Sequence, residues 1–180
     1  MKKIYFVRHG QTDYNLNHIA QGRLDIPLNA TGVEQAEVMA ENLKDTKIDV
    51  IYVSPLVRAK KTAEIINKFH NVKLIEDERI NEFDIGTMSG NISLDDWKAS
   101  GRLELVDNNE KYKAESWQEL YDRVINLYQE LEQSEVENIL IVSHSGVYHQ
   151  LYRYKNNDLD FRKKVPTPQN CEVIILKNEN

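Results

Sequence analysis

The chain has 180 residues, which is enough for one domain with a sizeable hydrophobic core. Hydrophobic residues make up 41% and charged residues 29%, and the net charge of −6 argues against nucleic acid as a partner, because binding a phosphate backbone needs clustered lysines and arginines. A single cysteine, Cys171, excludes an internal disulfide and fits a reducing compartment.

Short apolar runs alternate with amphipathic stretches along the chain. In chain order we expect a strand at 4–7, a helix at 31–43, a strand at 50–53, a helix at 57–69, a strand at 72–75, a helix at 116–131, a strand at 139–142, a helix at 147–154 and a strand at 173–176. This alternation predicts an α/β fold, a three-layer sandwich with a mostly parallel central sheet and helices on both faces. No linker or repeat divides the chain, so we expect one domain over residues 1–180.

Between residues 87 and 115, a segment that we call the excursion, the periodicity weakens. Charged residues alternate with the isolated aromatics Trp97 and Tyr112, and a short helix near residues 93–100 is expected. A stretch of this length without strong periodicity is often a lid or a specificity loop, and a solvated surface excursion fits the sequence equally well.

No targeting or membrane segment is expected. Only four apolar residues, 4–7, follow the lysines near the start, which is too few for the core of a signal peptide. No apolar run approaches the roughly 18 residues of a membrane span. We therefore expect a cytoplasmic protein without a membrane partner.

Histidines and arginines follow three of the predicted strands. Arg8 and His9 follow the first, Arg58 begins the helix after the second, and His144 follows the fourth. Taken singly, His144 is typical of a structural histidine and Arg58 of a solvated helix residue. However, ligands of α/β sheets bind at the carboxyl ends of strands, where these residues converge.

This set of residues suits a phosphoryl group. The planar fork of arginine makes two parallel charge-assisted hydrogen bonds to phosphoryl oxygens, and two such forks would neutralise a phosphate dianion. The same cations disfavour protonation of a neighbouring imidazole, which leaves one nitrogen of His9 free to attack phosphorus.

These residues stand in motifs that resemble the histidine phosphatase superfamily, which has the phosphoglycerate mutase-like fold. The resemblance runs in order from residue 4 to about residue 176. Its motifs are Arg8-His9-Gly10-Gln11-Thr12, Asn15, Gln21-Gly22, Asp25, Pro27-Leu28, Thr31-Gly32, Gln35-Ala36, Ser54-Pro55, Arg58-Ala59, Thr62-Ala63, Ile80-Asn81-Glu82, Gly86, Gly90 and Ser143-His144 with Gly146.

The resemblance implies a role for each matched position. His9 would be the nucleophile, and Glu82 would protonate the leaving oxygen and later activate water. Without the resemblance, Glu82 would be interpreted as a surface carboxylate. The residues expected to hold the phosphoryl group or to contact the substrate are Arg8, Asn15, Gln21, Gly22, Arg58, His144 and Ser145.

Two departures from the family pattern concern the substrate pocket. The segment that supplies the acid, residues 80–90, is called the acid segment. Many relatives carry Trp-Glu before its closing glycine, where this chain has Met88-Ser89. Many also have glycine directly after the second histidine, where this chain has Ser145. The hydroxyl of Ser145 would either donate to phosphate or merely keep the turn polar.

No metal and no other cofactor is expected. No set of side chains has the spacing of zinc ligands, and histidines flanked by arginines would repel a metal cation. Of the remaining histidines, His18 is interpreted as a solvated loop residue, with a substrate contact at the pocket rim as the alternative. His70 is interpreted as the end of a helix and His149 as structural.

The expected function is therefore that of a metal-independent phosphomonoesterase, which acts on small phosphorylated metabolites through a phosphohistidine. One alternative is a phosphotransferase of the phosphoglycerate mutase type, which would share all the catalytic residues but need longer insertions to exclude water. Another is a catalytically silent regulatory or binding protein, which the filled catalytic positions argue against. Removal of phosphate from protein histidines fits less well, because the chain has Glu82 and the excursion. The substrate and the oligomeric state stay open.

Overall fold

A mixed sheet of five strands forms the middle layer of the protein. The computed structural model describes residues 2–178. Its strands are β1 (Lys3–Arg8), β2 (Val50–Val53), β3 (Lys73–Glu76), β4 (Asn138–Ser143) and β5 (Val173–Asn178). Their order across the sheet is β3-β2-β4-β1-β5. Strands β3, β2, β4 and β1 run parallel, whereas β5 pairs antiparallel with β1 at the edge.

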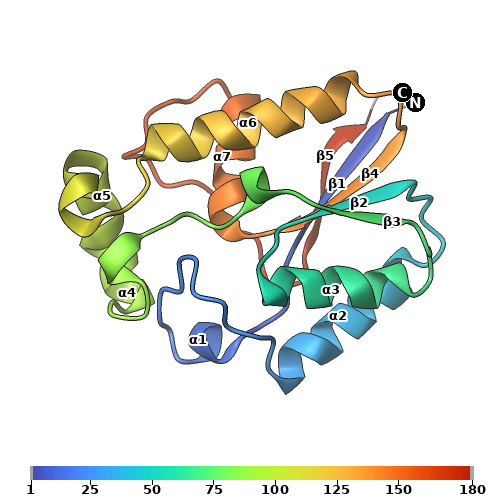
Figure 1. Cartoon of the computed structure of the whole chain (residues 1–180), viewed down its shortest axis with the longest axis horizontal. Helices are drawn as coiled ribbons and strands as arrows, with labels where there is room; N and C mark the ends of the chain where they lie inside the picture. Colours follow the sequence, from blue (N-terminus) through green and yellow to red (C-terminus); the bar gives the residue numbers. More distant parts are fainter. Residues whose placement is uncertain (1, 179–180) are drawn as a thin grey trace.

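Four helices cover the two faces of this sheet (Figure 1). They are α2 (Ala30–Leu43) and α3 (Val57–Asn67) on one face, and α6 (Trp117–Gln133) and α7 (Ser145–Lys155) on the other. The prediction of an α/β three-layer sandwich is confirmed, and the nine predicted elements agree with the observed ones within two residues at each end. Within residues 2–178, no helix combines the length and the apolar character that crossing a membrane requires.

The strands divide the hydrophobic core into two halves. Along β1, Ile4 and Phe6 belong to the half beneath α6 and α7, whereas Val7 belongs to the half beneath α2 and α3. Successive side chains of a strand point to opposite faces, so one strand contributes to both halves. All six residues of the central strand β4 are buried, which explains its unbroken apolar run.

Side chains fix where two of the helices begin. The Asn29 side-chain oxygen accepts the Gly32 N–H at the start of α2. Ser116 and Glu119 form a reciprocal capping box at the start of α6, in which each side chain accepts the other residue's backbone N–H. Helix α7 starts directly after His144, whose backbone is extended. His144 is therefore held at the junction of β4 and α7.

The excursion folds into short helical pieces beside the sheet. They are α4 (Leu94–Asp96), a π-helical turn η3 (Trp97–Gly101), α5 (Arg102–Asn108) and η4 (Asn109–Tyr112). The single short helix expected near residues 93–100 thus continues to residue 108. The remaining short elements are α1 (Asp13–Leu16), η1 (Glu78–Ile80) and η2 (Gly86–Met88). In Figure 1, α4 and α5 lie to one side of the sheet, with α1 nearby.

Candidate active site

A cavity of about 100 Å³ lies where the predicted site residues converge. The predicted residues that line it are Arg8, His9, Asn15, Gln21, Gly22, Arg58, Glu82 and Ser145. His144 is not among the lining residues, but its ring lies next to that of His9, with 5.0 Å between the ring centroids. Segments that are far apart in the sequence therefore meet at one place, as the strand-end pattern predicts.

The backbone and the ring of His9 are both fixed by hydrogen bonds. Its N–H donates to the Ser143 carbonyl at 2.9 Å, which extends the pairing of β1 with β4 by one residue. Its Nδ1 lies 2.7 Å from the Gly10 carbonyl oxygen. Because a carbonyl oxygen only accepts, Nδ1 carries the proton and Nε2 keeps its lone pair. Burial, followed by the charges of Arg58 and Arg8, holds the pKa of His9 well below its usual value.

Two arginines, the fully buried Arg58 and the partly buried Arg8, supply positive charge beside His9. Arg58, in the first turn of α3, donates from Nη1 to the Leu24 carbonyl at 2.7 Å and from Nη2 to the Gly22 carbonyl at 2.9 Å. Burial lowers the pKa of Arg58 to about 10, so it remains a cation at neutral pH. The Nε atoms of Arg8 and Arg58 are buried and have no hydrogen-bond partner among the described residues. An anion in the cavity would supply the acceptors that these donors lack.

His144 is oriented by a relay of two side chains. Its Nε2 lies 2.7 Å from the Ser54 hydroxyl, which donates to the Asn81 side-chain oxygen at 3.1 Å. The hydroxyl proton is thus committed to Asn81, so Ser54 accepts the proton of His144 Nε2. The Nδ1 of His144 is buried and has no partner among residues 2–178. Burial and the charge of Arg58 hold the pKa of His144 well below its usual value.

Glu82 is fixed by amide groups on one of its two oxygens. Its Oε1 accepts the N–H of Phe83 at 2.8 Å and the N–H of Gly146 at 3.0 Å. Its Oε2 accepts a long hydrogen bond from the Ser145 hydroxyl at 3.4 Å. Since Oε1 already accepts two hydrogen bonds, a proton on this carboxyl group belongs on Oε2. Among the described residues that line the cavity, Glu82 is the sole carboxylate.

The other residues predicted to contact the substrate, Asn15, Gln21 and Gly22, also form hydrogen bonds within the protein. The Asn15 side-chain oxygen accepts the Thr12 N–H at 3.2 Å, which leaves the amide NH₂ for a ligand. The Gln21 side-chain oxygen accepts from the Thr12 hydroxyl at 3.0 Å. Gly22 has a φ of +52°, in the left-handed region that favours glycine, and its carbonyl accepts from Arg58.

Sequence reasoning missed part of the cavity wall. The further lining residues include Phe83, Leu94, Trp97, Arg102, Trp117 and His149. The rings of Phe83 and Trp117 pack at 4.2 Å between centroids, and the excursion brings Trp97 to within 6.4 Å of Trp117. An isolated tryptophan in a polar segment was a usable signal for Trp97. His149 lies one helical turn after Ser145, so it shares the face of α7 that meets the cavity.

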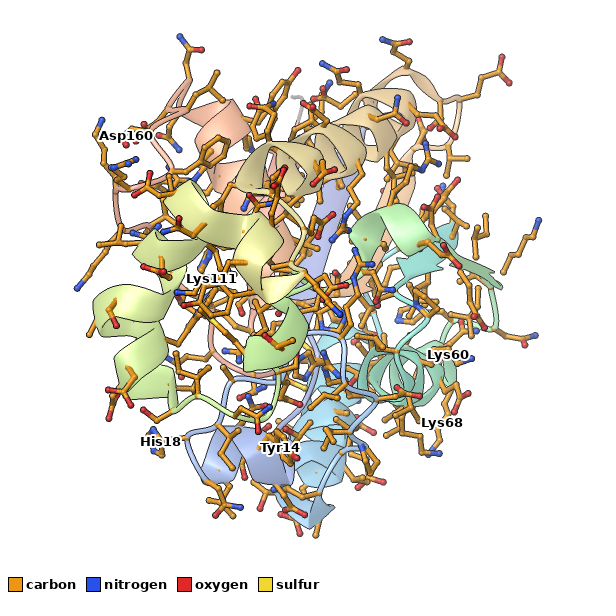
Figure 2. All side chains as sticks on the ribbon, turned by 60° about the vertical axis from the view of Figure 1, so that its left-hand side comes forward. Tyr14, His18, Lys60, Lys68, Lys111 and Asp160 are labelled. Atoms are coloured by element: carbon orange, nitrogen blue, oxygen red, sulfur yellow. The ribbon has the colours of Figure 1, made fainter. Side chains whose placement is uncertain are left out.

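The predictions for His18 and His70 concern residues outside the cavity wall. His18 is exposed and does not line the cavity, and Figure 2 shows it at the outside of the molecule. Burial lowers the pKa of His70, so a charged His70 at the end of α3 is disfavoured. Over residues 2–178, no three side chains of His, Cys, Asp or Glu gather into a set that could hold a metal ion.

Known proteins resemble this chain over most of its length. The family model of the histidine phosphatase superfamily (branch 1) matches residues 4–180. "Uncharacterized phosphatase PhoE" of Bacillus subtilis (strain 168) is 38% identical over 152 residues, which cover 84% of this chain and 76% of the relative. "Phosphoglycerate mutase-like protein 4" of Arabidopsis thaliana is 34% identical over 167 residues, with coverages of 83% and 69%. The structure of a mycobacterial glucosyl-3-phosphoglycerate phosphatase with VO3 superposes with a TM-score of 0.82 at 25% identity and covers 97% of this chain and 90% of that one.

Proposed function

The chain belongs to the histidine phosphatase superfamily (branch 1), and from this membership we propose that it is a phosphomonoesterase of small phosphorylated metabolites. His9 is the proposed nucleophile, and no metal ion takes part. The observation that carries the proposal is the protonation of His9. The Gly10 carbonyl keeps the proton on Nδ1, so Nε2 presents a lone pair beside Arg8 and Arg58.

The first chemical step transfers the phosphoryl group to the enzyme. Nε2 of His9 attacks phosphorus, a phosphorus–nitrogen bond forms, and the bond between phosphorus and the ester oxygen breaks. The leaving oxygen takes the proton from Oε2 of Glu82, so a neutral alcohol departs. Arg8 and Arg58 stabilise the charge that develops on the phosphoryl oxygens.

The second step returns the enzyme to its starting state. Glu82, now a carboxylate, takes a proton from water, and the resulting hydroxide attacks phosphorus. The phosphorus–nitrogen bond breaks, its electron pair returns to Nε2 of His9, and inorganic phosphate leaves. His144 contributes a hydrogen bond to the phosphoryl group from Nδ1, which requires its ring to take up a second proton when the dianion binds.

The test of the nucleophile is the covalent intermediate. Wild-type enzyme quenched in acid or in base during turnover of a ³²P-labelled ester should carry phosphate that is lost in acid and retained in base. His9→Ala should show neither the label nor turnover, with an unchanged circular dichroism spectrum. Near-normal activity of folded His9→Ala would rule out this mechanism.

The test of metal independence is a chelator. Activity should be unchanged in excess EDTA and should not need added magnesium. Vanadate, which can mimic five-coordinate phosphorus, should inhibit strongly. Activity that is lost in EDTA and returns with a divalent ion would contradict the metal-independent mechanism while leaving the family assignment intact.

A further inference from the structure

A second, larger cavity adjoins the candidate active site. It has a volume of about 270 Å³. The residues that line both cavities are Arg8, Leu94, Trp97, Arg102, Ser145 and His149. The rest of its wall consists of Lys98 from η3 and of Lys164, Val165 and Thr167 from the segment after α7. An ester whose phosphoryl group lies at His9 can therefore extend its alcohol part past this shared wall.

The charge of this cavity is opposite to that of the whole chain. Arg8, Lys98, Arg102 and Lys164 line it, whereas no aspartate or glutamate is among its described lining residues. The chain as a whole has 29 acidic and only 23 basic residues. A cleft lined by one sign of charge attracts ligands of the opposite sign.

Two of these cations are free to bind a ligand. Lys98 and Lys164 are exposed and form no ion pair or hydrogen bond with any residue between 2 and 178. Other lysines are paired, as Lys60 is with Glu76 at 3.2 Å and Lys111 with Glu104 at 3.3 Å. An unpaired lysine in a cavity wall offers three hydrogen-bond donors to an incoming anion.

Hydrogen bonds from arginine side chains to backbone carbonyls hold the two sides of the cavity together. Arg102, at the start of α5, donates to the carbonyls of Phe161 and Arg162, both at 2.5 Å. Arg153 on α7 donates to the Lys163 carbonyl at 2.7 Å. Figure 2 shows the excursion next to the segment that carries Asp160. The cavity is thus formed before a ligand binds, which lowers the entropic cost of binding.

We propose that this second cavity binds a further anionic group, a carboxylate or a second phosphate, on the alcohol part of the substrate. Lys98 and Lys164 are its specificity-determining residues, and Trp97 supplies an apolar wall for the carbon chain between the two anionic groups. This inference rests on the proposed function, because it takes the phosphoryl group to lie at His9.

Binding of phosphonates tests the cavity without turnover. Butylphosphonate has one anionic group, 4-phosphonobutyrate adds a carboxylate, and butane-1,4-bisphosphonate adds a second phosphonate. Titration calorimetry should give at least about tenfold tighter binding for one or both of the doubly anionic compounds, the fold-change expected for two partly screened charge contacts. The tighter of the two identifies the second group as carboxylate or phosphate. Equal affinities for all three compounds would overturn the proposal.

A double variant assigns the preference to the two lysines. In Lys98→Ala/Lys164→Ala the doubly anionic compounds should bind about as tightly as butylphosphonate, so the preference for a second anionic group is lost. Butylphosphonate itself should bind to this variant within about twofold of its wild-type affinity. The matched control is Lys68→Ala/Lys73→Ala, which removes two exposed lysines elsewhere and should keep the wild-type preference. Lys68 lies on the α3 side of the molecule, away from the excursion (Figure 2). A preference that survives in the cavity variant would overturn the assignment.

Turnover separates this inference from the proposed function. 3-Phosphoglycerate and glycerol 3-phosphate differ by a carboxylate in place of a hydroxymethyl group, and their kcat/KM ratio should depend on Lys98 and Lys164. Hydrolysis without any preference for a substrate with a second anionic group would support the phosphatase function but contradict the second anion site. If phosphonate binding depended on the lysines but no ester were hydrolysed, the second anion site would stand and the proposed phosphatase function would fall.

Discussion

Gly146 stands where a side chain would displace the proposed acid. A Cβ atom at this position would lie 2.2 Å from Oε1 of Glu82 and 3.2 Å from Cβ of Phe83. The N–H of the same residue donates to Oε1 at 3.0 Å. Gly146 thus both binds the carboxyl group and leaves room for it, so the geometry of the acid depends on the first turn of α7.

We expect Gly146→Ala to impair the same step as Glu82→Gln. A general acid matters most when the leaving alkoxide is a poor one, so both variants should lose more kcat/KM on an alkyl phosphate than on 4-nitrophenyl phosphate. For Glu82→Gln the alkyl phosphate should lose about 100-fold or more. The carboxylate is the flexible end of its side chain, so Gly146→Ala should still fold, which circular dichroism checks. Equal losses on both substrates would indicate a structural role for Glu82.

The site residues differ in how readily sequence reveals them. Arg8 and His9 stand at the end of β1 and Arg58 lies in the first turn of the helix after β2, so their convergence follows from the parallel sheet. Glu82 stands in an acidic stretch and is assigned by the family resemblance alone. Lys98 and Lys164 lie in segments without periodicity, and only the folded chain brings them to one cavity. Relays such as Ser54 with Asn81 depend on single contacts between distant segments, which have no local pattern.

At the scale of elements, α6 fixes the acid segment through one arginine. Arg123 donates from Nη1 to the carbonyls of Arg79 and Asn81, both at 2.8 Å, and from Nη2 to the Glu82 carbonyl at 3.1 Å. Its Nε donates to Glu115 at 2.6 Å. The side chains of Arg123 and Glu115 are only 16% and 11% exposed, so solvent screens this pair weakly.

Arg123→Gln should therefore destabilise the fold and disturb the acid. Loss of Arg123 leaves the nearly buried Glu115 with only the more exposed Arg23 as its ionic partner, at 3.2 Å, and we expect the free energy of unfolding in urea to fall by about 2 kcal/mol. The control on the same helix is Glu130→Gln, which breaks a more exposed pair with Arg79 and should cost less than about 1 kcal/mol. Similar costs for the two variants would contradict a clamping role for Arg123.

The periodic elements of the fold were predictable, whereas the excursion was not. Helix α6 has seven buried residues at helical spacing, which makes its pattern easy to read. In α5 only Leu105 is buried, so that helix has no apolar stripe. The antiparallel direction of β5 could not be predicted from the sequence either. An edge strand can pair in either direction, and the apolar run of β5 does not specify which.

At the scale of the whole molecule, buried histidines make stability depend on pH. Burial and the nearby arginines hold the pKa values of His9 and His144 well below about 6.5, the usual value, to which unfolding returns them. Below about pH 6.5 the unfolded chain therefore binds more protons than the folded one, and the free energy of unfolding decreases as the pH falls.

Each of the two histidines should contribute about 1.4 kcal/mol to the loss of stability between about pH 7.5 and about pH 5.5. Urea unfolding at the two pH values measures this difference. His144→Gln should make the difference smaller by that amount, whereas the exposed His18→Gln is the control variant. A difference that is unchanged in His144→Gln would show that folding does not lower the pKa of this histidine.

Hydrolysis and phosphoryl transfer need the same residues and differ in whether water reaches the phosphohistidine. A mutase must exclude water, hold its product and return the phosphoryl group to another hydroxyl. Here the site cavity adjoins a second cavity whose wall includes the exposed side chains of Lys98, Lys164 and Thr167. The acid segment has Met88-Ser89 in place of the usual Trp-Glu. These features favour access of water to the phosphoenzyme.

We therefore expect net release of inorganic phosphate from 3-phosphoglycerate and little conversion to 2-phosphoglycerate, even after priming with 2,3-bisphosphoglycerate. A second anionic group held at Lys98 and Lys164 would orient the substrate for attack by His9, but it would not keep water from the phosphohistidine once the alcohol has left. Phosphate release and isomer formation can be followed in one reaction by ³¹P NMR, with His9→Ala as the background. Interconversion much faster than phosphate release would identify a phosphotransferase and leave only the fold and the role of His9 in place.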